Sequence, residues 1–133
     1  MIVADSSAWI EHLRGTDHPA GRALERLFAR DVQVAVTEIV VMELLAGAEP
    51  GPPRGVLRER LVNLPMLTLA GLADFEAAAY IFQSCRRAGE TLRGMTDCLV
   101  AVPAIRAGAE ILHNDRDFDM IARHSPLKIH HPH

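Results

Sequence analysis

The chain opens on Met1-Ile2-Val3-Ala4-Asp5-Ser6-Ser7-Ala8-Trp9-Ile10, a short apolar run that ends at an aspartate and continues into helix-forming sequence. Residues 2–4 predict a buried strand, and a helix is expected to follow as far as about Arg14. Ser6 or Ser7 is expected to cap this helix, which would leave Asp5 free for chemistry. The opening therefore predicts a strand-to-helix turn that carries a carboxylate.

The same order of strand and helix recurs along the chain. Strands are also expected over 32–36, 66–69, 110–113 and 127–129, and helices over 18–30, 37–48, 54–64, 72–88, 96–107 and 118–124. Thr37 and Thr96 are the expected caps of two of these helices, and Pro103 should kink the second of them. This alternation predicts an α/β sandwich on a parallel sheet, with Asp5 and Asp115 on the edge that lines the ligand crevice.

The composition is that of an ordinary globular chain. Its 133 residues are 49% hydrophobic and 23% charged, with a formal net charge of −3, which suits one domain over 1–133 with a real core. No secretion signal and no apolar run of roughly 18 residues is seen, so neither export nor a membrane span is expected. Cys85 and Cys98 have no metal or redox spacing, and we expect reduced thiols in a cytoplasmic protein.

The basic residues are thirteen arginines and a single lysine, Lys128. The planar fork of arginine suits phosphate recognition, although the codon usage of a GC-rich genome would produce the same bias. Arg93 and Arg116 are the best candidates for holding a substrate phosphate, because they lie beside acidic residues at expected helix starts. The alternative is that both are structural counter-ions of those acidic residues.

Four carboxylates lie where a strand is expected to turn into a helix or where a helix is expected to be buried: Asp5, Glu43, Asp97 and Asp115. Glu43 interrupts an apolar helix, where an uncompensated carboxylate is costly. Asp97 lies in the first turn of its helix, where the helix dipole stabilises an anion in any case. Two like charges 4 Å apart repel by about 1–4 kcal/mol. Convergence of the four would therefore require a hard cation, Mg²⁺ or Mn²⁺.

The run Asn114-Asp115-Arg116-Asp117-Phe118-Asp119 places carboxylates at alternate positions. A calcium loop is excluded, because Met120 occupies its glycine position and Pro126 its glutamate position. We expect Asp115 to enter the crevice, Asp117 to cap the following helix and Asp119 to face solvent. Asp115 and Asp117 could exchange these roles.

Other chemistries have weaker support. Residues 130–133 contain three histidines and are expected to form a flexible tail. The remaining histidines, at positions 12, 18, 113 and 124, are scattered, and a metal-free acid–base ribonuclease built from two of them stays open. No histidine pair has the spacing of a zinc site on one helix. Ser7 stands where a phosphatase with a nucleophilic Asp5 would need a second acid.

Four segments, in this order, resemble the PIN-domain ribonucleases and specifically the VapC toxins: 3–10, 41–47, 96–101 and 112–118. The resemblance covers essentially the whole chain. It implies a PIN-like three-layer α/β/α domain with a mostly parallel central sheet. It also implies a Mg²⁺-dependent endoribonuclease, the toxin of a type II toxin–antitoxin pair, which inhibits growth or translation by cleaving structured RNA such as tRNA or rRNA.

The resemblance also assigns roles to residues. Asp5, Glu43, Asp97 and Asp115 would bind the metal and activate water, with Asp117 as a further metal ligand. Ser7 and Thr96 would orient ligands or bound water. Such proteins usually form homodimers and are blocked by a cognate VapB-type antitoxin. A non-catalytic, antitoxin-binding PIN-like module is the alternative, and Pro103 departs from the helix-forming residue usual at that position.

Overall fold

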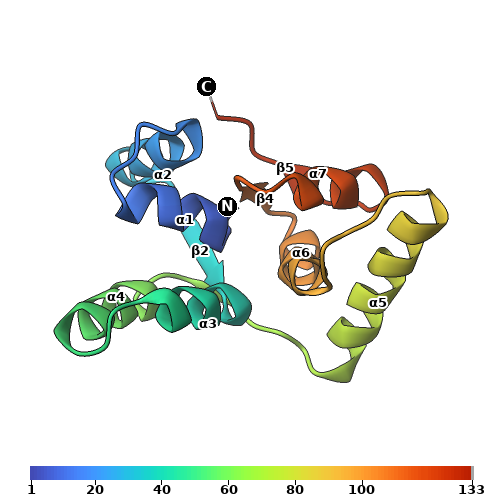
Figure 1. The fold of residues 1–133 in the computed structure, drawn as a ribbon, viewed down its shortest axis with the longest axis horizontal. Coiled ribbons are helices and arrows are strands. Elements are labelled where there is room, and N and C mark those ends of the chain that lie inside the picture. Colours follow the sequence, from blue (N-terminus) through green and yellow to red (C-terminus); the bar gives the residue numbers. More distant parts are fainter. Residues whose placement is uncertain (133) are drawn as a thin grey trace.

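The computed structural model describes residues 1–132, over which five strands form one sheet and seven helices pack around it (Figure 1). In chain order the elements are β1 (Ile2–Ala4), α1 (Ser6–Leu13), α2 (Pro19–Ala29), β2 (Val34–Thr37), α3 (Glu38–Gly47), α4 (Pro52–Val62), β3 (Met66–Leu67), α5 (Leu72–Arg87), α6 (Thr96–Ala107), β4 (Glu110–Leu112), α7 (Arg116–Arg123) and β5 (Lys128–Ile129). The predicted α/β fold class is confirmed.

The sheet is parallel throughout, with the strand order β3-β2-β1-β4-β5. In the central strand β1, Val3 lies opposite Ala35 of β2 and Ile111 of β4. The chain adds β2 and β3 on one side of β1, and later β4 and β5 on the other side. The winding therefore reverses between β1 and β4. Ligand crevices of open parallel sheets form at such a reversal, outside the carboxyl ends of the strands.

The strands are apolar, and the flanking helices bury the sheet that they form. Every residue of β1 and β2 is buried, as expected for parallel strands covered on both faces. The large side chains of Trp9, Leu24 and Phe118 are fully buried around them. Helices α1 and α2 approach closely at Gly21, where a Cβ atom would lie 3.0 Å from backbone atoms of Glu11 and His12. This contact holds α1 in the position from which it carries Asp5 at its start.

Helix α3 is less buried than its apolar sequence suggests. Thr37 caps it, as predicted, by accepting the backbone N–H of Val40 on its Oγ1 at 3.3 Å. Val40 and Leu44 are buried, but Met42 is 56% exposed. The expectation of a fully buried helix is therefore wrong, and Glu43 itself is half-buried.

Helix α6 runs from Thr96 to Ala107 without interruption, through a buried Pro103. Its N-cap is Met95, which makes no side-chain cap hydrogen bond, so the assignment of Thr96 as the cap is wrong. Thr96 is instead the first helical residue. Gly108 ends the helix in the left-handed conformation, with φ 65°, which glycine adopts without strain.

Helix α5 lies at the edge of the fold, at the right of Figure 1. The buried Asp74 carboxylate pairs with Arg106 of α6 and accepts the backbone N–H of Ala70 at 2.7 Å. Leu72 and Tyr80 are among its exposed apolar side chains. Within residues 1–132, no helix is long and apolar enough to cross a membrane.

His130 extends β5 rather than starting a free tail. Its backbone N–H donates to the carbonyl of Ile111 at 2.8 Å, and its Nδ1 lies 2.8 Å from Oε1 of Glu110. The flexible tail expected over 130–133 therefore does not begin at His130, and His133 lies outside the described residues.

Candidate active site

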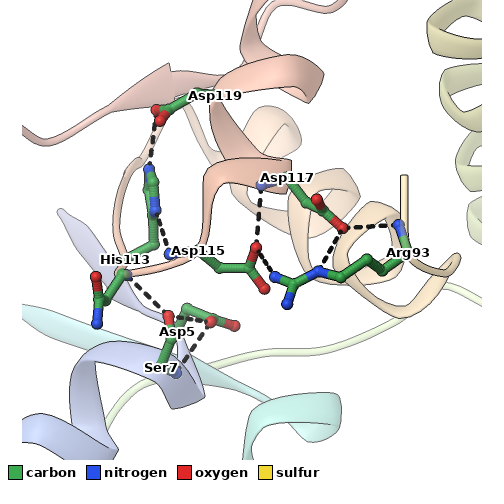
Figure 2. Close-up of polar contacts among 8 residues, drawn as sticks. Asp5, Ser7, Arg93, His113, Asp115, Asp117 and Asp119 are labelled. Atoms are coloured by element: carbon green, nitrogen blue, oxygen red, sulfur yellow. Dashed lines mark hydrogen bonds and ion pairs between the residues drawn. The ribbon is translucent and has the colours of Figure 1, made fainter. Parts of the chain in front are cut away.

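Asp5 and Asp115 lie at the reversal point of the sheet. Asp5 directly follows β1, and its backbone N–H donates to the carbonyl of Leu112, the last residue of β4, at 2.9 Å. Asp115 follows three residues later, in the turn that leads into α7 (Figure 2). The topology thus brings together two aspartates that are 110 positions apart in the sequence.

Asp5 is the N-cap of α1. Its Oδ2 atom accepts the backbone N–H of Ser7 at 3.0 Å and the hydroxyl of Ser7 at 2.6 Å. The prediction that Ser6 or Ser7 caps this helix is therefore wrong. An aspartate is favoured at the N-cap because its charge also interacts favourably with the helix dipole. Within residues 1–132, the other oxygen of Asp5, Oδ1, is buried and has no hydrogen-bond partner.

Asp115 is the N-cap of α7. Its Oδ1 atom accepts the backbone N–H of Asp117 at 3.0 Å. The helix begins at Arg116, two residues earlier than predicted. The prediction that Asp117 caps this helix is therefore wrong, because Asp115 is the cap. Asp115 also lines the cleft at this edge, as expected.

Asp117 is almost fully buried, with 2% of its surface exposed. Its Oδ2 atom accepts the backbone N–H of Arg93 at 3.0 Å, which ties the loop before α6 to α7. Its Oδ1 atom is buried and has no hydrogen-bond partner among the described residues. A buried carboxylate oxygen without a partner is energetically costly, and Oδ1 of Asp117 shares this condition with Oδ1 of Asp5.

Arg93 bridges Asp115 and Asp117 with its side chain. Its Nη2 atom pairs with Oδ1 of Asp115, and its Nε atom lies 3.6 Å from Oδ2 of Asp117 (Figure 2). Hydrogen bonding and charge attraction from Asp115 raise the pKa of Arg93 above its ordinary value. Arg116, by contrast, is exposed and forms no ion pair with any residue of the described chain.

Carboxylates from α6 and α7 meet in an acidic cleft of about 270 Å³. Single oxygens of Asp97, Asp115 and Asp117 all lie within 4.8 Å of one another. The cleft is lined by these three residues together with Glu43, Arg93, Gly94 and Thr96. Asp5 does not line it, but its charge acts on Asp97 and Glu43 from below the surface.

Glu43 reaches the cleft from α3. Its Oε1 atom accepts the hydroxyl of Ser6 at 3.1 Å, so α1 positions this carboxylate as well as Asp5. Burial, and then the charge of Asp5, raise the pKa of Glu43. Asp5, Asp115 and Asp117 share this arrangement with Glu43: one carboxylate oxygen accepts a hydrogen bond, and the other has no hydrogen-bond partner within residues 1–132.

The acidic residues resist ionising together. The pKa of Asp97 is raised to about 8, first by burial and then by the charges of its acidic neighbours, which are Asp5, Asp115, Asp117 and Glu43 in order of decreasing effect. Burial also raises the pKa of Asp5, against the hydrogen bonds from Ser7 that lower it. Hard oxygen ligands at this density suit a divalent cation, which would compensate both the repulsion and the unpartnered oxygens.

Ser7 and His113 hold the backbone at this edge, and His113 had no assigned role from the sequence. Ser7 Oγ accepts the backbone N–H of Asn114 at 2.9 Å while donating to Asp5. His113 accepts the backbone N–H of Asp115 on Nδ1 at 3.0 Å, and its Nε2 lies 3.1 Å from Oδ1 of Asp119 (Figure 2). The one signal in the sequence was a histidine two residues before a capping aspartate.

Comparison with known proteins identifies the family of this chain. Residues 2–124 match the PIN domain family. Ribonuclease VapC11 of Mycobacterium tuberculosis and a VapC ribonuclease of Mycobacterium bovis are each 46% identical to this chain over 130 residues, which is 96% of either sequence.

Solved structures agree on the fold. VapBC2 from Rickettsia felis, solved with a promoter DNA fragment, gives a TM-score of 0.72 at 19% identity and covers 98% of both chains. VapC20 of Mycobacterium tuberculosis, a toxin that cleaves the sarcin–ricin loop, gives a TM-score of 0.64 at 17% identity over 96% of this chain and 99% of that one. The chain therefore belongs to the PIN-domain family, within its group of VapC ribonucleases.

Proposed function

We propose that this chain is a metal-dependent endoribonuclease that hydrolyses RNA phosphodiester bonds as the toxin of a toxin–antitoxin pair. The observation that carries the proposal is the convergence of Asp97, Asp115 and Asp117 within 4.8 Å, beside buried carboxylate oxygens that have no hydrogen-bond partner in the described part of the chain. Membership among the VapC ribonucleases makes RNA the substrate class. Structured RNAs, tRNA or rRNA, are the proposed targets.

The proposed metal ligands are the oxygens that the fold leaves available. These belong to Asp5, Glu43, Asp97, Asp115 and Asp117, and Mg²⁺ is the proposed ion, with Mn²⁺ as a substitute. When bound, such an ion lowers the pKa of a water molecule and stabilises charge on a leaving oxygen. Ser6 and Ser7 hold Glu43 and Asp5 in place by hydrogen bonds at 3.1 and 2.6 Å. Thr96 lines the cleft and is proposed to orient bound water.

Arg93 and Arg116 are the proposed phosphate contacts. Arg93 pairs with Asp115 and Asp117, and the proposal gives it both of the roles considered for it, counter-ion and phosphate contact. It is a counter-ion when the carboxylates are free, and its exposed guanidinium becomes available to substrate when they bind a cation. Arg116 is exposed beside the cleft and needs no such release.

A cognate antitoxin is the proposed protein partner. An apolar groove of about 380 Å³ lies between α1, α3 and α4 and is lined by residues that include Leu13, Leu44 and Leu57. Glu43 lines both this groove and the acidic cleft. An antitoxin segment bound in the groove would therefore reach the catalytic carboxylates. Homodimer formation is also proposed, and the exposed Leu72, Phe75 and Tyr80 of α5 offer an apolar surface for it.

Cleavage of purified RNA tests the proposal. We expect wild-type protein to cut RNA with Mg²⁺ or Mn²⁺ and to lose this activity in EDTA. Asp97→Asn should be inactive while remaining folded, whereas Asp17→Asn, at an exposed site that pairs with Arg22, should keep full activity. Cleavage that persists in chelator would move the chemistry to the histidines, and absence of any cleavage would favour the non-catalytic antitoxin-binding module.

A further inference from the structure

The turn between β4 and α7 is held by backbone N–H groups that donate to side chains. Asn114 donates to Ser7 Oγ at 2.9 Å, Asp115 to His113 Nδ1 at 3.0 Å, and Asp117 to Asp115 Oδ1 at 3.0 Å (Figure 2). The first bond connects the turn to the Asp5 cap, and the third starts α7. The second bond is the one that fixes the backbone of Asp115 itself.

The hydrogen bond from Asp115 defines the tautomer of His113. A backbone N–H can only donate, so Nδ1 of His113 must present its lone pair. The proton of the neutral ring is then on Nε2, which lies 3.1 Å from Oδ1 of Asp119. A carboxylate at this distance accepts that proton's hydrogen bond and selects the tautomer, as carboxylates do for histidines that bind metals.

The imidazole ring is also held by packing. Its side chain is 9% exposed, and its centroid lies 5.3 Å from that of Phe118 at an interplanar angle of 40°. Phe118 is fully buried in the core. Both nitrogens and one face of His113 therefore have fixed partners, which makes the ring a rigid support rather than a mobile surface group.

We propose that His113 is a positioning residue for Asp115. In the Nε2–H tautomer selected by Asp119, it accepts the backbone N–H of Asp115 and sets the direction in which the Asp115 carboxylate enters the acidic cleft. The hydrogen bonds run from Asp119 through His113 to Asp115, and His113 affects the metal only through Asp115. This inference rests on the proposed metal site, since that is where the position of Asp115 matters.

The tautomer can be measured without any metal. In ¹⁵N NMR spectra of the full chain at pH 7.5, Nδ1 of His113 should have the shift of a nitrogen with a lone pair, and Nε2 that of a protonated nitrogen. The amide proton of Asp115 should show a scalar coupling across the hydrogen bond to Nδ1 of His113, or strong protection from solvent exchange. Either signal should be lost in His113→Leu. A proton on Nδ1, or an Asp115 amide that exchanges freely in wild type, would overturn the proposal.

Two variants separate the acceptor from the ring. Asn places its Oδ1 where His113 has Nδ1, so His113→Asn keeps the acceptor for Asp115, whereas His113→Leu removes it but still packs on Phe118. Titration with Mn²⁺ should show affinity near the wild-type value for His113→Asn. For His113→Leu we expect a loss of about tenfold, the range found for residues that orient metal ligands.

A double-mutant cycle with Asp115→Asn shows whether the effect passes through Asp115. In that background, His113→Leu should produce no further loss of Mn²⁺ affinity. An equal tenfold loss with and without the Asp115 carboxylate would show a general effect on the fold and would refute positioning. If wild-type protein binds no Mn²⁺, the proposed function fails, and the NMR measurements still decide whether His113 orients the Asp115 backbone.

Discussion

The backbone N–H of Asp117 donates to Oδ1 of Asp115 at 3.0 Å, so that one acidic residue of the cleft caps the helix that carries another. The same device operates on the other side of the sheet reversal, where Asp5 caps α1 and Ser6 of that helix binds Glu43. Helix initiation and placement of the acidic residues therefore depend on the same side chains.

Asp97→Asn should stabilise the metal-free protein while it removes activity. The pKa of Asp97 is raised to about 8 by burial and by its acidic neighbours, so replacing it with a neutral isostere relieves repulsion. We expect a higher Tm in EDTA at pH 8 and an RNA cleavage rate at least about 100-fold lower. The exposed Asp17→Asn is the control for both. A lower Tm for Asp97→Asn would contradict this account of its pKa.

The stability of the metal-free protein should decrease between about pH 4 and pH 8. Asp97 has a folded-state pKa of about 8, against an ordinary value of 3.8. Over this range the unfolded chain releases a proton that the folded chain keeps, so rising pH favours unfolding. Urea denaturation in EDTA at several pH values measures the effect. Saturating Mn²⁺ should make the free energy of unfolding increase with pH, since the ion binds the ionised carboxylate. A free energy of unfolding that increases with pH in EDTA would contradict the prediction.

Arg93→Gln should bind Mn²⁺ more tightly than wild type. The guanidinium pairs with Asp115 and Asp117, and a cation must compete with it for these carboxylates. Because Arg93 is largely exposed, the gain should be modest, about two- to fivefold. Calorimetry gives the affinity, and the same variant should bind RNA more weakly in the presence of metal.

Arg116→Gln is the matched control for Arg93. It removes the same charge from a neighbouring site that has no ion pair within the described chain. Its Mn²⁺ affinity should change less than that of Arg93→Gln. Equal gains for the two variants would show that only the net charge matters, and that the contact of Arg93 with the carboxylates does not.

Gly21→Ala should destabilise the fold by about 1–3 kcal/mol, because the added methyl group meets the backbone of α1. Its Cβ would lie 3.0 Å from backbone atoms of Glu11 and His12. Gly55, in the exposed face of α4, has nothing within 4 Å of such a Cβ, and Gly55→Ala should instead gain about 0.5–1 kcal/mol. Chemical denaturation of both variants measures the difference. A neutral Gly21→Ala would mean that α1 and α2 can move apart at no cost.

Strand-to-helix alternation predicted most of the fold, because short apolar runs and amphipathic helices have distinct periods. The assignment of Thr37 as a cap was right, but the cap assignments of α1 and α7 failed for a local reason. Ser6, Ser7 and Asp5 are all good cap residues, and sequence cannot tell which of them has extended backbone geometry. The same ambiguity led to Asp117, and not Asp115, as the expected cap of α7. The exposure of Met42 was missed because an apolar helix face has the same sequence whether the fold covers it or leaves it open.

The acidic cluster was only partly predictable from the sequence. Parallel strand ends share one edge of the sheet, which put Asp5 and Asp115 together, whereas the convergence of Glu43 and Asp97 with them was a condition and not a result. The cleft contains Glu43, Asp97, Asp115 and Asp117, and Asp5 lies beneath it. The position of His113 two residues before Asp115 was the one signal of its contact with that residue, and the sequence gave no sign of the contact between His113 and Asp119. Those contacts depend on the path of the turn after β4, which is set by tertiary hydrogen bonds to Ser7 and to the loop at Arg93.

The double duty of Asp5 and Asp115 as helix caps affects how genetic screens should be interpreted. Replacing an N-cap aspartate with alanine costs about 0.5–2 kcal/mol of stability, which can reduce the abundance of a protein in the cell several-fold through proteolysis. An alanine variant at either position that no longer inhibits growth therefore has two explanations, a low protein level or the loss of the site's chemistry. Asparagine keeps the capping oxygen, so it is the substitution that separates the two causes.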